Sequence, residues 1–478
     1  MSPLEIEVKQ FVLTRSYYEF FKWSFAILFP NEPYSDNFHV KYFCDILQQE
    51  IERIRRREPK TLDLLCNIPP RTSKSLIVSV ALNAWTWIDS PTIPFISVSF
   101  DEKLSLLNAQ YCRDLIASEE YQILFGDRYK VRHDSDSKGF FMNNKGGFRM
   151  STTTGSNITG HKGAVIIVDD PQNPSTSESK VEREKTINYY TKSLFNRLTP
   201  INLGIRIIIM QRLHANDLTG YILTNFPELY RHICLPAELS DLVKPESMRK
   251  YYKDGLLDIL RLSKQTLSDF KKVLGSRGYA GQYGQNPSAE EGGILKPEWF
   301  DIVRPETIIR DTINEPIHFF IDSAYTAKTE NDPTSIKTGF RQGNYLYILD
   351  VQEVWLAFPD LIRYIQEHVK KFQVSPNSKL FIEPKASGLD IVNQLREITM
   401  LNIIESKNPT ADKITRANGI SPICEGKRVR LVEGRYIDKF LEQVRLFPNA
   451  EHDDMIDTLG IAVNELLVHD SIDFIMVG

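Results

Sequence analysis

The chain of 478 residues is longer than one ordinary domain, so the sequence predicts two or three domains. Hydrophobic residues make up 42% and charged residues 25% of it, which supplies a folded core and excludes an intrinsically disordered chain. The formal net charge is −4, so a nucleic-acid partner would have to bind at a local basic patch, because the surface as a whole is not basic.

Cysteine usage and hydropathy indicate where the protein works. The five cysteines are scattered and form no Cys-x-x-Cys pair, which is typical of a reducing compartment and argues against structural zinc. The first residues, MSPLEIEVKQ, lack the basic and apolar parts of a signal peptide, and no run reaches about 18 uninterrupted apolar residues. We therefore expect a soluble cytoplasmic protein that does not enter a membrane.

The first 60 residues have helical patterns, and short apolar runs alternate with helix-length segments after them. The apolar runs at 61–68, 94–100, 163–170 and 204–211 are each bounded by turn residues or polar breaks. Such runs predict a mainly parallel sheet with helices on both faces. Residues 1–274 are therefore expected to form an α/β domain that includes the helical N-terminal segment and a lid subdomain.

The stretch CNIPPRTSKSLIVSV leads from a predicted strand into a predicted helix through Lys74 and Ser75. A phosphate-binding loop needs converging backbone N–H groups, a lysine for the β- and γ-phosphates, and a hydroxyl for Mg²⁺. Arg71, Thr72 and Ser73 stand where such loops normally carry glycine, which lets the backbone approach phosphate closely. The alternatives are a nucleotide site built from these five residues and a strand–turn–helix with an exposed lysine.

A second apolar run, VIIV, ends in the adjacent carboxylates Asp169 and Asp170. Successive strand residues point to opposite faces, so the two carboxylates can take different tasks. We assign Asp169 to the Mg²⁺ shell, and Asp170 to orienting or deprotonating the attacking water. The alternative is a strand end followed by a turn, which the order Asp-Asp-Pro also suits.

A third predicted strand carries polar residues at its carboxyl end, where the ligands of parallel sheets bind. These residues are Gln211, Arg212, His214 and Asp217, and we include Gln211 among the nucleotide-binding residues as a sensor of the γ-phosphate. Arg149 lies in a stretch rich in Gly, Ser and Thr and is a candidate arginine finger, with a solvated loop as the alternative.

A stretch rich in Gly, Gln and Ser follows, and residues 275–312 are expected to be a linker. After it, IHFFIDSAY and NYLYILDVQEVW are predicted to be neighbouring strands with the turn RQGN between them, and KLFIEPKA to be a further strand. DDMIDTLGIAVNELLV is predicted to be a helix with aspartates in its first turn. Residues 313–478 are thus expected to form a second α/β domain.

Separated carboxylates in this second domain predict a metal site. Asp322 lies within an apolar strand, where a carboxylate is costly unless it is paired or bound to metal, and Glu383 repeats the pattern. Two-metal phosphodiester cleavage needs carboxylates from different elements around ions about 4 Å apart. We take Asp322, Glu383 and Asp454 as candidate catalytic residues and metal ligands, with Asp453 as a further ligand. A capping role for Asp453 and a helix-dipole role for Asp457 are the alternatives.

Three further features near these carboxylates leave alternatives open. Asp332 is either a fourth ligand or a turn residue, with the turn favoured, and His452 is a candidate helper. Residues 401–440 contain eight Lys or Arg against five Asp or Glu. This excess can hold a DNA backbone, or it can belong to an ordinary solvated surface.

Taken together, the motifs resemble those of the large terminase subunit of tailed phages and prophages. IPPRTSKS resembles the family's phosphate-binding loop PPR-x-GKS, VIIVDDP its Walker B strand, and MQRLHANDLTG its coupling motif. YAGQYGQNPSAEEGGILKPEW is similar to the segment that follows the family's ATPase domain. DKITRANGISPICEGKRVRLV and FPNAEHDDMIDTL are similar to the end of its nuclease domain. Two positions depart from the family pattern, since Ser73 replaces a usual glycine and MQRLH replaces a usual TRWH.

The resemblance implies an N-terminal P-loop ATPase domain of the RecA-like ASCE class and a C-terminal RNase H-like nuclease domain. It implies ATP and Mg²⁺ as cofactors, with Mn²⁺ as the alternative in the nuclease. By resemblance, the nuclease cuts concatemeric viral DNA, and ATP hydrolysis drives the duplex through a portal into a procapsid.

The partners that the resemblance implies are double-stranded viral DNA, the portal protein, a small terminase subunit and further copies of the chain. These copies would form a ring, a pentamer, in which an arginine finger can act in trans. The implied location is the host cell cytoplasm, transiently at the portal vertex of the procapsid and not in the mature virion.

Two other functions stand as alternatives on the sequence. A cellular helicase–nuclease of DNA repair would carry helicase motifs with stacking aromatic residues after the second nucleotide strand, and none is convincing here. A non-enzymatic prophage remnant that only docks on a portal would have lost its acidic ligands. The chain keeps Asp169, Asp170, Asp322, Glu383 and Asp454.

Overall fold

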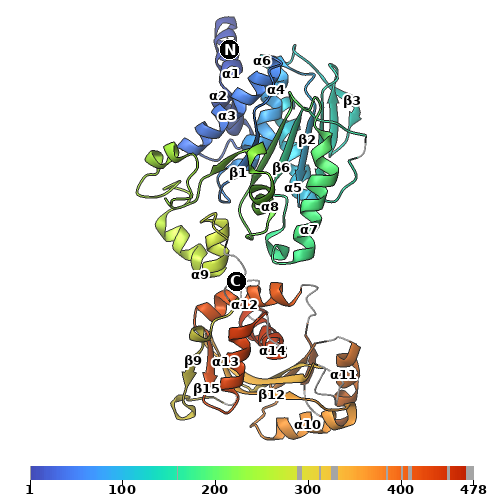
Figure 1. Ribbon diagram of the computed structural model, residues 1–478, viewed down its shortest axis with the longest axis vertical. Helices are drawn as coiled ribbons and strands as arrows, with labels where there is room; N and C mark the ends of the chain where they lie inside the picture. The colour runs from blue at the N-terminus through green and yellow to red at the C-terminus, as the bar shows by residue number, and fades with distance from the viewer. Residues whose placement is uncertain are drawn as a thin grey trace. The chain divides into compact units, whose positions relative to one another are not determined.

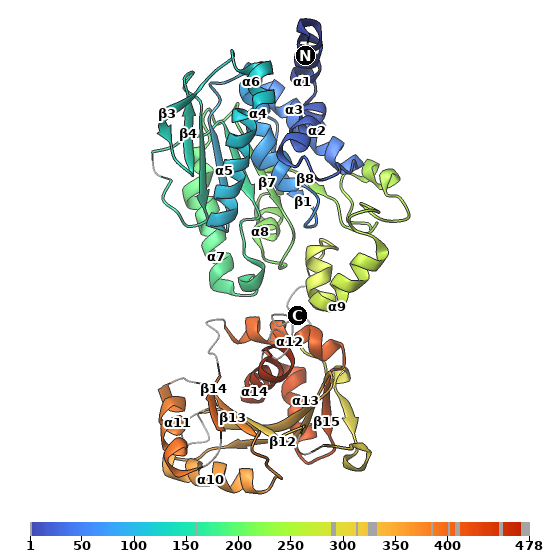
Figure 2. The same cartoon turned by 180° about the vertical axis from the view of Figure 1, so that it is seen from behind.

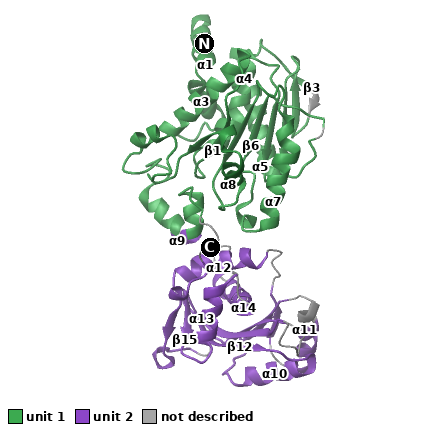
Figure 3. Ribbon diagram, in the orientation of Figure 1, with its two compact units in different colours: residues 1–271, 277–289 green, residues 272–276, 290–478 purple. Residues whose placement is uncertain are grey.

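The computed structural model describes residues 2–158, 160–287, 293–311, 314–323, 332–383, 386–399, 402–406, 412–448 and 453–469. The chain forms two compact units (Figure 3). Unit 1 comprises residues 1–271 and 277–289, and unit 2 comprises residues 272–276 and 290–478.

The stretch expected to be a linker, residues 275–312, is divided between the two units. Its first part continues the helix α9 (Lys264–Gln282), which kinks at Gly275, where φ is 70°. Further along, Ile294, Leu295 and Phe300 are buried in the apolar core of unit 2. The many Gly, Gln and Ser residues of the stretch led to the prediction of a linker. Its few apolar residues nevertheless pack into the core of unit 2.

Unit 1 is built on an eight-stranded sheet with the order β3-β4-β5-β2-β6-β7-β1-β8 (Figures 1 and 2). Neighbouring strands in the series β5-β2-β6-β7-β1-β8 run parallel to one another. β4 is antiparallel to its two neighbours, β3 and β5. The strands are β1 (Asp63–Asn67), β2 (Phe95–Ser99), β3 (Val131–Asp136), β4 (Phe140–Asn143), β5 (Phe148–Thr153), β6 (Val165–Asp169), β7 (Ile205–Met210) and β8 (Tyr230–Cys234). The four strands predicted from apolar runs, β1, β2, β6 and β7, are the buried central ones.

Helices cover both faces of this sheet. On one face, Val98 and Val168 belong to an apolar cluster with Tyr190 and Leu218 of the covering helices. On the other face, η1 and α5 contact β6, β2 and β5. The helices are α1 (Pro3–Arg15), α2 (Tyr17–Leu28), α3 (Phe38–Arg55), the π-helical η1 (Leu76–Ala81), α4 (Leu82–Asp89), α5 (Glu102–Ala117), α6 (Glu119–Phe125), α7 (Lys180–Asn188), the π-helical η3 (Tyr189–Leu194), α8 (Leu218–Asn225) and α9. The predicted doubly wound arrangement and helical start are confirmed.

Unit 2 is built on a mixed seven-stranded sheet with the order β14-β13-β10-β11-β12-β15-β9. β11 is antiparallel to β10 and β12, and the other neighbours run parallel. The strands are β9 (Asp301–Val303), β10 (His318–Asp322), β11 (Thr334–Gln342), β12 (Tyr345–Val354), β13 (Lys379–Ile382), β14 (Asn402–Glu405) and β15 (Val429–Val432).

The prediction that IHFFIDSAY and NYLYILDVQEVW form neighbouring strands is wrong. β11 lies between β10 and β12, and the RQGN turn joins β11 to β12. The sequence of β11 lacks the apolar run that is typical of a central strand, because this strand buries the polar side chains of Ser335, Lys337 and Thr338.

Two helical layers enclose the sheet of unit 2 (Figure 1). One layer contains α12 (Lys413–Glu425), α13 (Ile437–Leu446) and α14 (Asp454–Val463), which the π-helical η9 (Asn464–His469) extends. The other contains α10 (Phe358–Lys370) and α11 (Ala386–Ile398). The last helix is confirmed, and both units have the predicted α/β class. In the part of the chain that the structure describes, no helix is both long enough and apolar enough to cross a bilayer.

Candidate active sites

The first candidate site lies at the carboxyl edge of the parallel strands in unit 1. The loop after β1 supplies Lys74, and the ends of β6 and β7 supply Asp170 and Gln211. Lys74 Nζ lies 2.8 Å from Asp170 Oδ2 and 2.9 Å from Oδ1. The backbone N–H of Gln211 donates to Asp170 Oδ1 at 3.2 Å. Three residues predicted from separate motifs therefore meet at one place, and the Asp170 carboxylate has a fixed orientation there.

The loop before Lys74 has the backbone shape that glycine normally permits. Arg71 and Ser73 adopt φ values of 64° and 60°, in the left-handed region. Between them, Thr72 is buried, and its hydroxyl donates to the Pro69 carbonyl at 2.8 Å. The Thr72 carbonyl lies 3.1 Å from Nε2 of His39, whose pKa burial lowers to about 4. His39 is thus neutral at pH 7, and its Nε2–H donates to the loop.

Asp169 is buried beneath the helix that follows the loop. The Ser79 hydroxyl donates to Asp169 Oδ2 at 2.8 Å. Burial and the neighbouring Asp170 raise the pKa of Asp169 to about 6, while Lys74 and the hydroxyls of Ser75 and Ser79 act in the opposite direction. Its Oδ1 is buried and accepts no hydrogen bond from the described residues. Carboxylate and hydroxyl oxygens are ligands that Mg²⁺ accepts, so Asp169 and Ser75 fit this ion.

The side chain of Arg71 lies against α9. Its guanidinium carbon lies 5.2 Å from the centroid of the Phe270 ring of α9. The Phe270 ring in turn stacks on Tyr283 at a centroid distance of 4.9 Å. The structure thus places the Arg71 side chain on an aromatic ring, and its nucleotide-binding role stays a prediction.

Arg149 is neither a finger that reaches out of the unit nor a solvated loop residue. It lies in β5 with an exposed fraction of 0%, and none of its guanidinium nitrogens has a hydrogen-bond partner among the described residues. Burial lowers its pKa, and the nearby Cys112 and Asp169 oppose this effect. A side chain enclosed in this way cannot extend into a neighbouring subunit, so the expectation of a finger in trans does not fit Arg149.

The polar residues after Gln211 stabilise their own loop. Asp217 caps α8 by accepting from Gly220 N–H at 2.9 Å, and it binds Arg212 Nε at the same distance. His214 is buried, and its Nδ1 accepts from Asn216 N–H at 3.0 Å. Burial, together with neighbouring arginines, lowers the pKa of His214 to about 4. Of the residues predicted after β7, Gln211 donates its backbone N–H to Asp170.

The second candidate site lies at the edge of unit 2 where β10 and β13 end. Asp322 is the last residue of β10, and Glu383 follows β13, its parallel neighbour. The Glu383 N–H continues the ladder by donating to the Ile321 carbonyl at 3.2 Å. Their exposed fractions are 8% and 1%, so two carboxylates are buried side by side at one strand edge.

Asp454 brings a third carboxylate to this edge from the start of α14. Burial raises the pKa of Asp454 to about 7, and the nearby Asp322, Asp332 and Asp453 raise it further against the effect of Lys413. Asp454 Oδ2 is buried and accepts no hydrogen bond from the residues that the structure describes. The predicted acids Asp322 and Asp454, from a strand and a helix, are therefore close enough for one to affect the other, and Asp332 acts on the same carboxyl.

Two cations of α12 lie among these acids. Lys413 Nζ is 2.5 Å from Asp453 Oδ1 and 3.5 Å from Asp457 Oδ2. Arg416 Nη1 is 3.2 Å from Glu383 Oε1, and its Nη2 is 2.7 Å from Asp457 Oδ1. Asp453 stands at the N-cap position of α14 but makes no side-chain capping bond, so its carboxylate is used by Lys413 instead.

Within the described ranges, no group of three or more His, Cys, Asp or Glu side chains is arranged to hold a metal ion. Glu383, Asp453 and Asp457 are each paired with a cation of α12 in this structure. The candidate helper His452 lies outside the described residues.

Much of the basic excess between residues 401 and 440 is used inside unit 2. Besides Lys413 and Arg416, Lys427 pairs with Asp301 at 2.8 Å, and Lys439 pairs with the buried acid Glu353 at 2.6 Å. The stretch therefore offers a DNA backbone less positive charge than its composition suggests.

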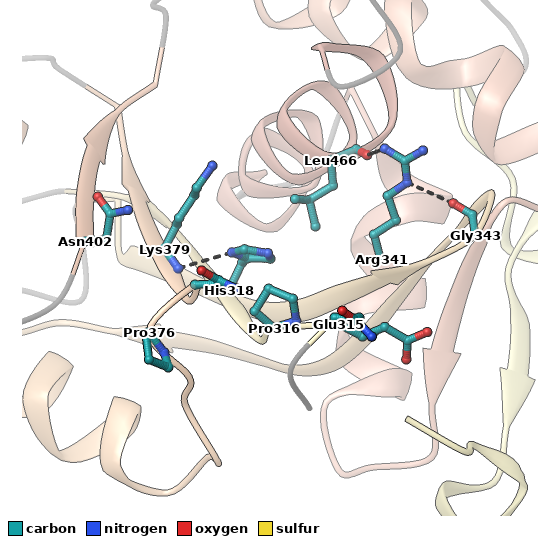
Figure 4. A pocket seen from close by; sticks show the side chains of 11 residues that line it. Glu315, Pro316, His318, Arg341, Gly343, Pro376, Lys379, Asn402 and Leu466 are labelled. Carbon is teal, nitrogen blue, oxygen red and sulfur yellow. Dashed lines mark hydrogen bonds between the residues drawn. The ribbon is translucent and has the colours of Figure 1, made fainter. Parts of the chain in front are cut away.

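A cavity of about 770 Å³ opens at the other end of the same strands (Figure 4). His318 and Lys379, the first residues of β10 and β13, line it together with Arg341 and Leu466. The Lys379 N–H donates to His318 Nδ1 at 3.2 Å, and burial lowers the pKa of His318 to about 4. Because Asp322 ends β10 and Glu383 follows β13 at the opposite end of these strands, the cavity is separate from the carboxylate edge.

Sequence reasoning missed three side chains that organise the two sites. Ser79 lies one helical turn after Ser75, and this spacing is the signal that places both hydroxyls on one helix face. Lys413 and Arg416 are three positions apart in α12, which places them on one side of this helix. Their acidic partners come from other elements, and no local pattern reveals these pairs.

Comparison with known proteins identifies the fold. No protein-family model and no curated protein sequence matches the chain. Crystal form 2 of the large terminase from a thermophilic bacteriophage is 13% identical with a TM-score of 0.50, and the match covers 88% of this chain and 98% of that one. The same phage protein in complex with ADP is 13% identical over the same shares with a TM-score of 0.48. The large terminase of bacteriophage HK97 is 9% identical with a TM-score of 0.37, over 95% and 99% of the two chains. From the match with crystal form 2 of the thermophilic phage protein, we conclude that this chain has the fold of a phage large terminase.

Proposed function

We propose that this protein is the DNA-packaging motor subunit of a tailed phage or prophage. ATP hydrolysis drives duplex DNA through the portal into the procapsid, and a metal-dependent endonuclease cuts concatemeric DNA when packaging starts and ends. The observation that carries the proposal is the presence of two separate polar sites in one chain of large-terminase fold. These are the Lys74–Asp170 pair of unit 1 and the carboxylate edge of unit 2.

ATP hydrolysis is assigned to unit 1. Lys74 neutralises charge on the β- and γ-phosphates, and the backbone N–H groups of its loop bind phosphate oxygens. Ser75 and Asp169 would hold Mg²⁺, which supplies further neutralisation of the phosphates when bound. Asp170 orients or deprotonates the attacking water, and Gln211, whose N–H fixes Asp170 at 3.2 Å, senses the γ-phosphate.

DNA cleavage is assigned to unit 2, as an RNase H-like nuclease. Asp322, Glu383 and Asp454, with Asp453, would hold Mg²⁺ or Mn²⁺, which supplies Lewis acidity and lowers the pKa of bound water. The buried Asp454 Oδ2, which accepts no hydrogen bond within the described part of the chain, supports a ligand role for Asp454. The rigid ends of β10 and β13 fix the directions of the other two carboxylates.

The partners and location in this proposal rest on the sequence resemblance. They are double-stranded viral DNA, the portal protein, a small terminase subunit and a pentameric ring of this chain on the procapsid. The protein would act in the host cell cytoplasm and would be absent from the mature virion. An arginine that acts in trans would have to come from a position other than the buried Arg149.

Two single substitutions test the proposal. Asp322→Ala should abolish cleavage of supercoiled plasmid with Mg²⁺ or Mn²⁺ in the absence of ATP, while ATP turnover continues. Lys74→Ala should do the reverse, and Lys103→Ala, at an exposed position of α5, should change neither activity.

Two outcomes would contradict the assignment. If folded wild-type protein cuts no plasmid with either metal, the nuclease is excluded and the helicase or docking alternatives gain support. If either substitution removes both activities without unfolding the protein, the two sites are not independent.

A further inference from the structure

Arg416 joins two acids of unit 2 that come from different elements. It extends from α12 and contacts Glu383, after β13, and Asp457, in α14. We propose that Arg416 is a positioning residue of the nuclease centre, which fixes the Glu383 carboxylate for metal binding. In this arrangement, Asp457 is the anchor of Arg416 and not a metal ligand. The inference rests on the nuclease function proposed above.

The geometry of the bridge supports a fixed orientation. Arg416 Nη1 lies 3.2 Å from Glu383 Oε1, and Nη2 lies 2.7 Å from Asp457 Oδ1. The side chains are exposed by only 12%, 2% and 4%, respectively. A guanidinium is a planar fork whose donors have fixed directions, so one side chain sets the positions of both carboxylates relative to each other. Such contacts are stronger away from water than at a surface.

The neighbouring cation, Lys413, is more exposed. It reaches Asp453 at 2.5 Å, and its side chain is 42% exposed, compared with 12% for Arg416. Water therefore screens the contacts of Lys413 more than those of Arg416. Asp457 lies within reach of both cations, with Oδ1 2.7 Å from Arg416 Nη2 and Oδ2 3.5 Å from Lys413 Nζ.

A competing explanation is that Arg416 occupies the place of a metal ion and must leave before metal binds. The two explanations predict opposite changes in the affinity for metal when Arg416 is removed. A positioning residue strengthens metal binding, so its removal weakens the affinity. A competing cation weakens metal binding, so its removal strengthens the affinity.

Calorimetric titration of the full chain with Mn²⁺, without DNA, separates the two explanations. Arg416→Gln should weaken Mn²⁺ binding by about 10- to 100-fold, as is usual when a partner that orients a metal ligand is lost. Arg416→Lys should recover part of the affinity, because it keeps the charge but loses the fork. Arg396→Gln, which removes an exposed pair with Glu405, should bind Mn²⁺ like the wild type.

The role of Asp457 is tested by combining substitutions. Asp457→Asn should weaken Mn²⁺ binding as much as Arg416→Gln does, and the double variant should be no worse than either single one. A ligand role for Asp457 would instead make the double variant bind more weakly than both. Thermal unfolding of the chain reports whether unit 2 of each variant is folded, and ATP turnover reports whether unit 1 is unaffected. If Arg416→Gln does not fold, Arg416→Lys and Asp457→Asn decide the question.

The inference is overturned if folded Arg416→Gln binds Mn²⁺ as tightly as the wild type or more tightly. Failure of the proposed nuclease gives a different result, since wild-type protein would then cut no plasmid, and Asp322→Ala would bind Mn²⁺ as tightly as the wild type.

Discussion

Two residues of the candidate phosphate-binding loop have a strained backbone conformation that glycine would adopt without strain. Arg71 and Ser73 lie in the left-handed region, at φ values of 64° and 60°. This conformation costs a residue with a Cβ atom about 1–2 kcal/mol, because the Cβ approaches the following carbonyl oxygen. The contacts of the buried Thr72 and of His39 hold the loop in this shape. The loop therefore keeps its form through tertiary contacts, without the usual glycines.

Ser73→Gly should raise the free energy of unfolding of unit 1 by about 0.5–1 kcal/mol. The relief of strain exceeds the extra freedom that glycine gives the unfolded chain, which is roughly 0.5–1 kcal/mol. Urea unfolding of the full chain measures the change. Ser75→Gly is the matched control, because Ser75 has helical backbone with φ of −66°, where glycine should lower the stability by about 1 kcal/mol. A shift of both variants in the same direction would contradict this explanation.

Lys337 is a buried lysine in the middle of unit 2. It lies in β11 with an exposed fraction of 0%, and its Nζ is 4.5 Å from the centroid of the Phe440 ring. No described residue accepts a hydrogen bond from this Nζ. Burial lowers the pKa of Lys337 to about 7, while Glu353, Asp350 and Cys424 act in the opposite direction.

This pKa makes the stability of unit 2 depend on pH. The unfolded chain keeps the lysine proton up to its ordinary pKa of 10.5, and the folded chain loses it near 7. Between these values the unfolded state binds more protons, so the stability rises as the pH increases from about 7 towards 10. Lys337→Met should abolish this rise, and at pH 6 the variant should exceed the wild type by a few kcal/mol, at about 1.4 kcal/mol per pKa unit.

Urea unfolding at pH 6, 8 and 10 checks this expectation. Lys370→Met, at the exposed end of α10, should keep the dependence on pH of the wild type. A Lys337→Met variant less stable than the wild type at pH 6 would show that the buried ammonium is favourable in its charged form.

Strands that are buried on both faces could be predicted from the sequence where they are apolar, and could not be predicted where they contain polar residues. The central strands of unit 1 are continuous apolar runs, because helices cover both of their faces. β11 is equally central in unit 2, yet it buries Ser335, Lys337 and Thr338, and the two hydroxyls among them have partners on helices. Ser335 Oγ, for example, lies 3.0 Å from Thr458 Oγ1 of α14. A strand that buries polar groups against distant partners has no local signature.

The pairing of β11 with β12 leaves no room for a larger side chain at Gly339. A Cβ atom there would lie 2.5 Å from the Tyr347 carbonyl oxygen, at the point where the register of the two strands shifts. Gly339→Ala should therefore destabilise unit 2 by about 1–3 kcal/mol, as overpacking usually does. Thermal unfolding measures the loss, and plasmid cleavage should fail at a lower temperature while ATP turnover is kept.

Gly419→Ala in α12 is the matched control for Gly339→Ala. Gly419 is exposed, and a Cβ atom there would meet nothing within 4 Å, so alanine should stabilise the helix by up to about 1 kcal/mol. Equal effects of the two substitutions would show that glycine is not required for the pairing of β11 with β12.

At the scale of the whole molecule, the sequence predicted two α/β units and the elements that carry each set of acids. Asp322 and Glu383 could be found because a carboxylate in an apolar strand is conspicuous. The division of residues 275–312 between the units could not be found, because Ile294, Leu295 and Phe300 are few and widely spaced. The burial of Arg149 and the ion pairs of α12 also escaped prediction, because they depend on which elements pack together.

In the proposed ATPase, the ion pair between Lys74 and Asp170 would make phosphate binding an exchange of anions. The carboxylate of Asp170 lies 2.8 Å from the lysine ammonium. A nucleotide that binds Lys74 would have to compete with this carboxylate, so the free energy of the ion pair would lower the affinity for nucleotide. Binding of phosphate would release the carboxylate, and release of phosphate would restore the pair. In the proposed ATPase, the base would therefore become available at the moment when there is a phosphate to hydrolyse.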